Sequence, residues 1–135
     1  MQVLIGELGE LGRRAVACKH WRWMDGMLTG SYRVVGIDDD DDCVIACLLL
    51  IKNAGHVWEC EDFSDMIPNL SDPATLGCLL HLVREAHTNE LISTFNRAMM
   101  INDWCVVGED HHGVHIYAEN QGSEIEALVA ALEAV

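Results

Sequence analysis

The sequence predicts an α+β fold, an antiparallel β-meander with a central helix and terminal helices packed on the sheet. Three observations predict this class. A well-marked helix occupies the middle of the chain, short apolar stretches separated by turn residues precede it, and a hairpin followed by a helix comes after it. The 135 residues are expected to form a single α+β domain, residues 1–135, which is large enough to build a stable core without disulfides or bound metals.

Residues 3–18 are predicted to form the first helix, because apolar residues recur on one face at helical spacing. That face carries Leu4, Leu8, Leu11 and Ala15. Gly6, Gly9 and Gly12 lower the stability of the helix, but their spacing places them near one side of it. We therefore expect another backbone segment to approach the helix closely on that side.

The region before the central helix is predicted to be a meander of three or four strands joined by short turns. Trp21 and Trp23 alternate as in a strand, and Asp25-Gly26 follows as a turn. The later strands are expected at residues 31–37, 43–51 and 56–61. An acidic run and the sequence Asn53-Ala54-Gly55 separate these strands as turns.

The central helix is predicted over residues 71–87 and is the clearest element of the sequence. Asp72 can cap the free N–H groups of the first turn, and Pro73 suits the first helical position, where no N–H is needed. Its apolar stripe consists of Leu76, Leu79, Leu80, Val83 and Ala86. Thr88-Asn89 is expected to end the helix, which should therefore be the central packing element of the fold.

The C-terminal part is predicted to be a hairpin followed by a helix. Residues 91–101 fit both a helix and a strand, and we favour a strand or irregular segment. The two strands of the hairpin are residues 104–108 and 114–118, around a turn at residues 110–113. Ser123 and Glu126 form a capping box that begins the last helix. The apolar face of that helix comprises Ile125, Leu128, Val129 and Leu132.

The charge of the chain is strongly acidic and uneven. Twenty-two aspartates and glutamates face eight lysines and arginines, which gives a net charge of −14. Residues 1–52 carry −2, whereas residues 53–135 carry −12, with Arg84 and Arg97 as their only basic side chains other than histidine. Such a surface repels nucleic-acid backbones and attracts basic protein surfaces. Direct binding of nucleic acid is therefore not expected, and solubility is the alternative role for the charge.

No residue set indicates a catalytic or cofactor chemistry, and neither an enzyme activity nor a cofactor is expected. Cys43 and Cys47 would lie ~13 Å apart on one strand, too far to share a tetrahedral metal ion. The six cysteines are predicted to be reduced, buried thiols. His111, His112 and His115 gather at the hairpin, so a small metal-dependent enzyme or binding module stays an alternative.

Three stretches of the sequence resemble a group of small uncharacterised bacteriophage and prophage proteins. They are Trp-Arg-Trp-Met-Asp-Gly-Met at residues 21–27, residues 68–80 with the sequence Leu-Ser-Asp-Pro-Ala-Thr-Leu-Gly-Cys-Leu-Leu at their end, and residues 126–133. Asp25 stands where the group is expected to have proline, and His87 where tryptophan is often expected. The resemblance implies a phage accessory protein that is made in the cytoplasm of an infected bacterial cell, and it transfers no catalytic residue.

From the charge and this resemblance, the sequence predicts a non-enzymatic phage protein that binds and inhibits a host nucleic-acid-handling protein, in the manner of anti-CRISPR inhibitors. Its partner would be a basic surface of a host bacterial protein, with no direct contact to nucleic acid or membrane. The candidate partner-binding residues are Glu109, Asp110, Glu119, Glu124, Glu126, Glu59, Glu61, Asp62, Asp38, Asp39, Asp40, Asp41 and Asp42. A virion or assembly component that acts by self-association, for example as a homodimer, is a further alternative.

Overall fold

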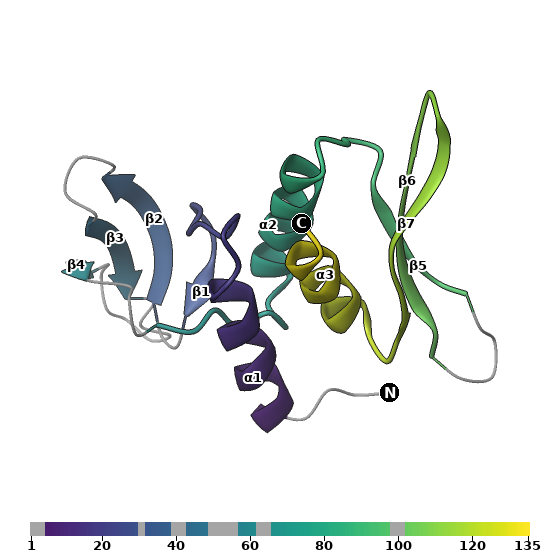
Figure 1. The fold of residues 1–135 in the computed structure, drawn as a ribbon. Coiled ribbons are helices and arrows are strands. Elements are labelled where there is room, and N and C mark those ends of the chain that lie inside the picture. Colours follow the sequence, from purple (N-terminus) through teal and green to yellow (C-terminus); the bar gives the residue numbers. More distant parts are fainter. Residues whose placement is uncertain (1–4, 30–31, 39–42, 49–56, 62–65, 98–101) are drawn as a thin grey trace.

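The computed structural model describes residues 5–29, 32–38, 43–48, 57–61, 66–97 and 102–135 (Figure 1). Its elements are α1 (Ile5–Val16), β1 (Leu28–Thr29), β2 (Tyr32–Asp38), β3 (Cys43–Leu48), β4 (Val57–Glu61), α2 (Pro73–Ala86), β5 (Ser93–Asn96), β6 (Trp104–Asp110), β7 (Gly113–Gln121) and α3 (Glu124–Glu133). This order of helices and antiparallel strands confirms the predicted α+β class.

The strands form two antiparallel sheets, and the helices lie between them (Figure 1). The first sheet has the order β1-β2-β3-β4, and the second has the order β5-β6-β7. Both are meanders, because every strand pairs with its neighbour in sequence. The sequence predicted helices packed on one antiparallel sheet, whereas the structure divides the strands between two sheets. The division follows from the position of α2, which separates β4 from β5 along the chain and occupies the space beside β1.

The predicted strand around Trp21 and Trp23 is wrong. Residues 21–24 belong to no strand. The N–H of Trp21 donates to the carbonyl of Cys18 at 3.1 Å, and the N–H of Met27 donates to the carbonyl of Met24 at 3.2 Å. The two indole rings pack edge to face, with centroids 5.5 Å apart. Backbone N–H and carbonyl groups that would pair with a neighbouring strand are therefore hydrogen-bonded within local turns.

The first helix meets another backbone segment at one of its three glycines. A Cβ added to Gly12 would come within 2.4 Å of Ile67 Cγ2 and 3.0 Å of the Pro68 carbonyl oxygen. No such contact exists at Gly6, where the space is open, and the nearest atom to a Cβ at Gly9 is in the Arg13 side chain at 3.7 Å. The expected close approach is therefore confirmed at Gly12, where the chain enters α2.

The two ends of α2 are fixed by different devices. Asp72 is the N-cap and accepts a hydrogen bond from the Thr75 N–H at 3.1 Å, with proline in the first turn, as predicted. At the other end, Thr88 N–H donates to the Glu85 carbonyl at 3.1 Å, and Asn89 N–H donates to the Arg84 carbonyl at 2.9 Å. This is a Schellman ending, in which Thr88 takes the left-handed position with φ 53° that glycine normally fills.

The core is built from α2 and α3, with contributions from α1, β2, β6 and the segments around Met27, Leu70 and Ile92. Leu79, Leu82 and Val83 of α2 and Leu128 and Leu132 of α3 are essentially inaccessible to solvent. Further buried apolar residues are Leu11, Ala15, Met27, Val34, Leu70, Ile92, Val106, Ala127, Val129 and Ala131. The central helix therefore has the packing role that the sequence predicted.

The last helix and the strand before the hairpin also agree with the sequence. Ser123 caps α3 by accepting from the Glu126 N–H at 3.1 Å, and the Glu126 carboxylate accepts from the Gly122 N–H at 2.8 Å. This is a capping box displaced by one residue at its carboxylate arm. The ambiguous region 91–101 contains β5, which confirms the preference for a strand. Among the described helices, none is long and apolar enough to cross a membrane.

Candidate functional site: the acidic hairpin and the open face of the C-terminal sheet

The hairpin of β6 and β7 ends in a tight, ordered acidic turn. Asp110 and Gly113 are paired across it, and Gly113 has a positive φ of 117°, which only glycine adopts readily. The Asp110 carboxylate accepts from the His112 N–H at 2.7 Å, and His115 Nε2 lies 3.0 Å from it. The His112 N–H and, after it, His115 lower the pKa of Asp110. Asp110 is therefore an ionised carboxylate at neutral pH, and it holds the turn in shape.

Glu109 is the second carboxylate at this end of the hairpin. It is exposed, and it lies directly opposite Val114 in the register of β6 and β7. Opposed residues of an antiparallel pair project on the same face of the sheet. Glu109 and Val114 therefore share one face, and no ion pair joins Glu109 to another residue in the described part of the chain.

Among the described elements, α3 packs on one face of the three-stranded sheet, and none of them covers the other face (Figure 1). On the covered face, Val106 is fully buried opposite Thr94 and Ala118. The opposite face, here called the outer face, carries Ser93 and Phe95 of β5, Val107 and Glu109 of β6, and Val114 and Ile116 of β7. A register shift, in which Val106 pairs with Ala118 but Val107 pairs with Ile116, brings Ala118 to the covered face although Ile116 is on the outer one. Val114 is 68% exposed, Ile116 54% and Phe95 43%. The outer face therefore presents apolar side chains to solvent with a free carboxylate beside them.

The end of the outer face away from the turn is closed by a charge network around Arg97. Its Nε donates to Asp103 at 2.8 Å, and its Nη1 donates to Glu119 at 3.2 Å. The hydrogen bond from Arg97 is the main reason why the pKa of Asp103 is lowered. One guanidinium thus serves two carboxylates, so this end of the sheet keeps a net negative charge. Nearby Cys105 is a buried free thiol, and its burial raises its pKa.

Glu124 and Glu126, both predicted as partner-binding residues, have structural partners instead. Glu124 Oε1 accepts from the Thr94 hydroxyl at 2.8 Å, and Glu126 serves the cap of α3. Both are half-buried. They follow the end of β7, whereas Glu109 and Asp110 end β6 beside the start of β7, so the length of β7 separates the two groups (Figure 1). The C-terminal candidates therefore do not form one cluster.

The remaining predicted residues belong to the other sheet or lie outside the described residues. Glu59 and Glu61 lie on β4 and pair with Ala46 and Val44 of β3. Asp38 is the last residue of β2 and pairs with Cys43. Asp39, Asp40, Asp41, Asp42 and Asp62 lie outside the part of the chain that the structure describes. The first sheet is on the far side of the helices from the hairpin, so Glu59, Glu61 and Asp38 cannot extend the outer face (Figure 1).

Most arginines that the structure describes are already neutralised by carboxylates. Arg33 binds Asp72 through two hydrogen bonds of 3.1 and 3.2 Å. The other pairs are Arg13 with Glu10, Arg14 with Glu133, Arg22 with Glu85, and Arg97 with Asp103 and Glu119. Few cations are therefore left on the described surface to balance Glu109, and the excess of acidic charge is exposed.

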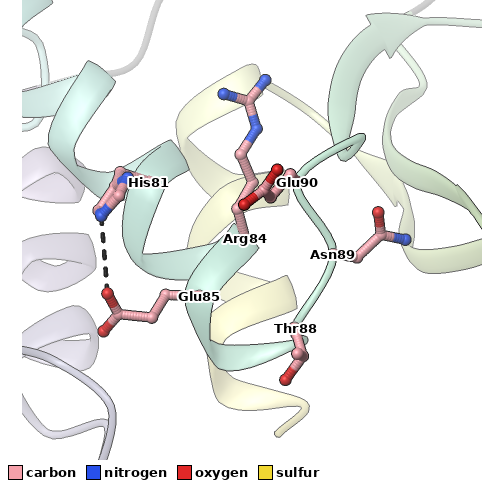
Figure 2. Close-up of a pocket in the computed structure, with 6 residues that line it drawn as sticks. All are labelled: His81, Arg84, Glu85, Thr88, Asn89 and Glu90. Atoms are coloured by element: carbon pink, nitrogen blue, oxygen red, sulfur yellow. Dashed lines mark ion pairs between the residues drawn. The ribbon is translucent and has the colours of Figure 1, made fainter.

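A shallow pocket of about 550 Å³ lies at the C-terminal end of α2 (Figure 2). His81, Arg84, Glu85, Thr88, Asn89 and Glu90 line it. Figure 2 shows the His81–Glu85 pair along one side of α2 and the Arg84 side chain pointing away from that pair. Arg84 Nε donates to the Ile92 carbonyl at 2.9 Å, and Asn89 bonds to Tyr117 Oη at 3.2 Å. These polar groups hold the end of the helix and do not converge on one point in the pocket.

The histidines of the hairpin are not arranged as metal ligands. His115 Nε2 lies 3.0 Å from the Asp110 carboxylate, whereas the rings of His111 and His112 pack on each other with centroids 3.9 Å apart. Among the described residues, no group of three histidine, cysteine or acidic side chains could hold a metal ion. Three of the tryptophans, Trp21, Trp23 and Trp104, are half-buried against the core.

Sequence reasoning missed the outer face as a feature. Val114 and Ile116 alternate with His115 and Tyr117 in the sequence, and the structure leaves the first pair exposed and the second pair half-buried. The alternation did not reveal which set α3 would cover, because apolar and amphipathic side chains stand on both faces. Comparison of the chain with protein-family models, with curated proteins and with solved structures found no match.

Proposed function

We propose that this protein is a non-enzymatic phage accessory protein that binds a basic surface of a host nucleic-acid-handling protein and so inhibits it. The acidic hairpin end, Glu109 with Asp110, would occupy positions that nucleic-acid phosphates otherwise take. Carboxylates and phosphates are both anionic acceptors for lysine and arginine, so one basic groove can bind either of them.

The observation that carries this proposal is the unbalanced acidic charge of the exposed surface. The described arginines other than Arg84 are already in ion pairs, while Glu109 is exposed and has none of these pairs. A partner that supplied lysine or arginine there would meet a carboxylate whose charge is not already compensated. Such complementarity raises the association rate and selects partners, more than it raises affinity by itself.

The test is capture of binding proteins from bacterial lysate with the tagged protein at low and high salt, followed by affinity measurements on the purified partner. Charge reversal to lysine is made separately at Glu109, at Glu59 with Glu61 and Asp62, and along residues 38–42; Asp110 is left unchanged because it holds the turn in shape. We expect the hairpin reversal to weaken binding at low salt, with each exposed charge contributing on the order of 0.5–1 kcal/mol.

A matched control for the hairpin is Glu10→Lys, which makes the same change of charge on α1 as Glu109→Lys makes at the hairpin. Glu10 is exposed and holds only a loose pair with Arg13 at 3.7 Å, so the fold should tolerate the substitution. If the three cluster reversals and this control all bind like the parent at low salt, electrostatic mimicry is the wrong mechanism.

A further inference from the structure

The outer face of the second sheet gathers three of the five large apolar side chains that are exposed among the described residues, namely Phe95, Val114 and Ile116. Val114 and Ile116 stand two residues apart on the edge strand β7, and Val107 of β6 lies directly opposite Ile116. Phe95 of β5 extends the same face toward the other edge. Contiguous exposed apolar side chains rimmed by polar ones are typical of interaction surfaces in soluble proteins. The question is what covers this face.

We infer that the outer face docks a segment of the partner in which apolar side chains are interspersed with lysine or arginine. This inference rests on the proposed function and names the chemistry of the partner at the acidic site. The apolar row supplies the anchor, and the carboxylates at its two ends select the charge of the segment that binds.

Charge complementarity favours this occupant over a second copy of the chain. Glu109 stands at one end of the outer face, and Glu119 and Asp103 share Arg97 at the other, so both ends are negative. A second copy would bring the same carboxylates onto them, and the net charge of −14 adds to that repulsion. A basic segment would bury the apolar row and pair its cations with Glu109.

In this arrangement the apolar side chains and the charges should affect different rate constants of binding. The exposed apolar side chains lie between the charges, as buried anchors do at the centre of protein interfaces, with charged groups at the rim. Removing a rim charge should mainly slow association, whereas removing the apolar anchors should mainly speed dissociation. The two contributions can therefore be measured independently on the same protein.

The test uses three short synthetic peptides and the full chain. In the first, leucine alternates with lysine; in the second, serine replaces leucine; in the third, glutamate replaces lysine. Affinity is measured by fluorescence anisotropy, and the site is located from amide chemical-shift changes. We expect the leucine–lysine peptide to bind most tightly and to shift the amides of Val107, Val114 and Ile116.

The key variant is Val114→Thr with Ile116→Thr, which keeps β-branched residues on the strand while removing most of the apolar surface. We expect it to bind the leucine–lysine peptide about tenfold more weakly, which corresponds to 1.4 kcal/mol. Val135→Ser, which removes a partly exposed apolar side chain at the C-terminus, is the matched control and should bind like the parent. Glu109→Gln should reduce the association rate and the salt dependence.

Three results would overturn the inference. The first is equal binding of the serine–lysine and leucine–lysine peptides. The second is unchanged binding by the double threonine variant, with shifts elsewhere on the protein. The third is a parent dimer that this variant converts to a monomer, which would make the face a self-interface. Salt-dependent capture of a host protein would survive the first two results, so failure of the docking face is distinguishable from failure of the proposed function.

Discussion

Replacement of Asp72 should show how strongly α2 is tied to the first sheet. Its carboxylate caps α2 through the Thr75 N–H, accepts from the Thr75 hydroxyl at 2.9 Å and binds Arg33 of β2 twice. The Thr75 hydroxyl also accepts from the Leu28 N–H at 2.8 Å. Asp72 therefore joins the start of α2 to β2 directly, and it joins α2 to β1 through the Thr75 hydroxyl.

The magnitude follows from the separate parts of this network. Loss of an N-cap costs about 1 kcal/mol. Loss of charge-assisted hydrogen bonds to a half-buried arginine costs roughly 1–2 kcal/mol more. Asp72→Ala should therefore lower the free energy of unfolding by about 2–3 kcal/mol. Asp72→Asn, which can still cap the helix, should lower it by about 1–2 kcal/mol.

Urea denaturation followed by circular dichroism measures these differences, with Asp25→Asn as the matched control. Asp25 lies exposed on the neighbouring turn, so its variant should stay within about 0.5 kcal/mol of the parent. A double-mutant cycle of Asp72→Asn with Arg33→Gln should give a coupling energy of at least about 0.5 kcal/mol. Equal losses for the alanine and asparagine variants, with no coupling, would refute the reasoning.

The same network predicts an acid dependence of stability. The hydrogen bonds from Arg33, and secondarily those from Thr75, lower the pKa of Asp72 in the folded protein below its model-compound value of 3.8. The unfolded chain therefore binds a proton here at higher pH than the folded protein does. The stability from this group is complete above that value and is lost as the pH falls through the lowered pKa. The Asp72→Asn variant should show a shallower loss of stability over this acidic range.

Three further substitutions test the packing and the backbone. Leu79→Ala should lower the free energy of unfolding by ~2–5 kcal/mol because it leaves a cavity in the core, and a loss below ~1 kcal/mol in urea would make α2 peripheral. Thr88→Gly should raise the melting temperature through a gain of about 0.5–1 kcal/mol, since glycine relieves the left-handed conformation; a lower melting temperature would contradict this. Gly108→Ala should destabilise by ~1–3 kcal/mol because its Cβ would come within 2.5 Å of Asn89 Nδ2, and an unchanged midpoint would show that the neighbours move freely.

Local signals account for the parts of the fold that the sequence predicted well. Asp72 with Pro73, and Ser123 with Glu126, mark the starts of α2 and α3 through hydrogen bonds within a few residues. The β6–β7 hairpin is likewise fixed by its short turn. Such features depend on neighbours in sequence, so a single chain reveals them.

The features that were missed depend on contacts between distant segments. Alternation at Trp21 and Trp23 suggested a strand, but no neighbouring strand pairs with these residues. Thr88 occupies a left-handed position that usually holds glycine, so the residue type did not predict the left-handed conformation. The exposure of Val114 and Ile116 depends on which face of the sheet α3 covers. The sequence located the acidic residues of the candidate site but not the apolar row between them.

Competition on the partner is the most direct test of the central claim. The host protein captured from lysate is mixed with its labelled nucleic acid, and the release of the label is followed as this protein is added at several salt concentrations. The proposed mechanism predicts complete release by the parent, weaker release as salt rises, and a higher concentration for half-release by the Glu109→Lys variant. A ternary complex in which the nucleic acid stays bound at saturating protein would contradict it.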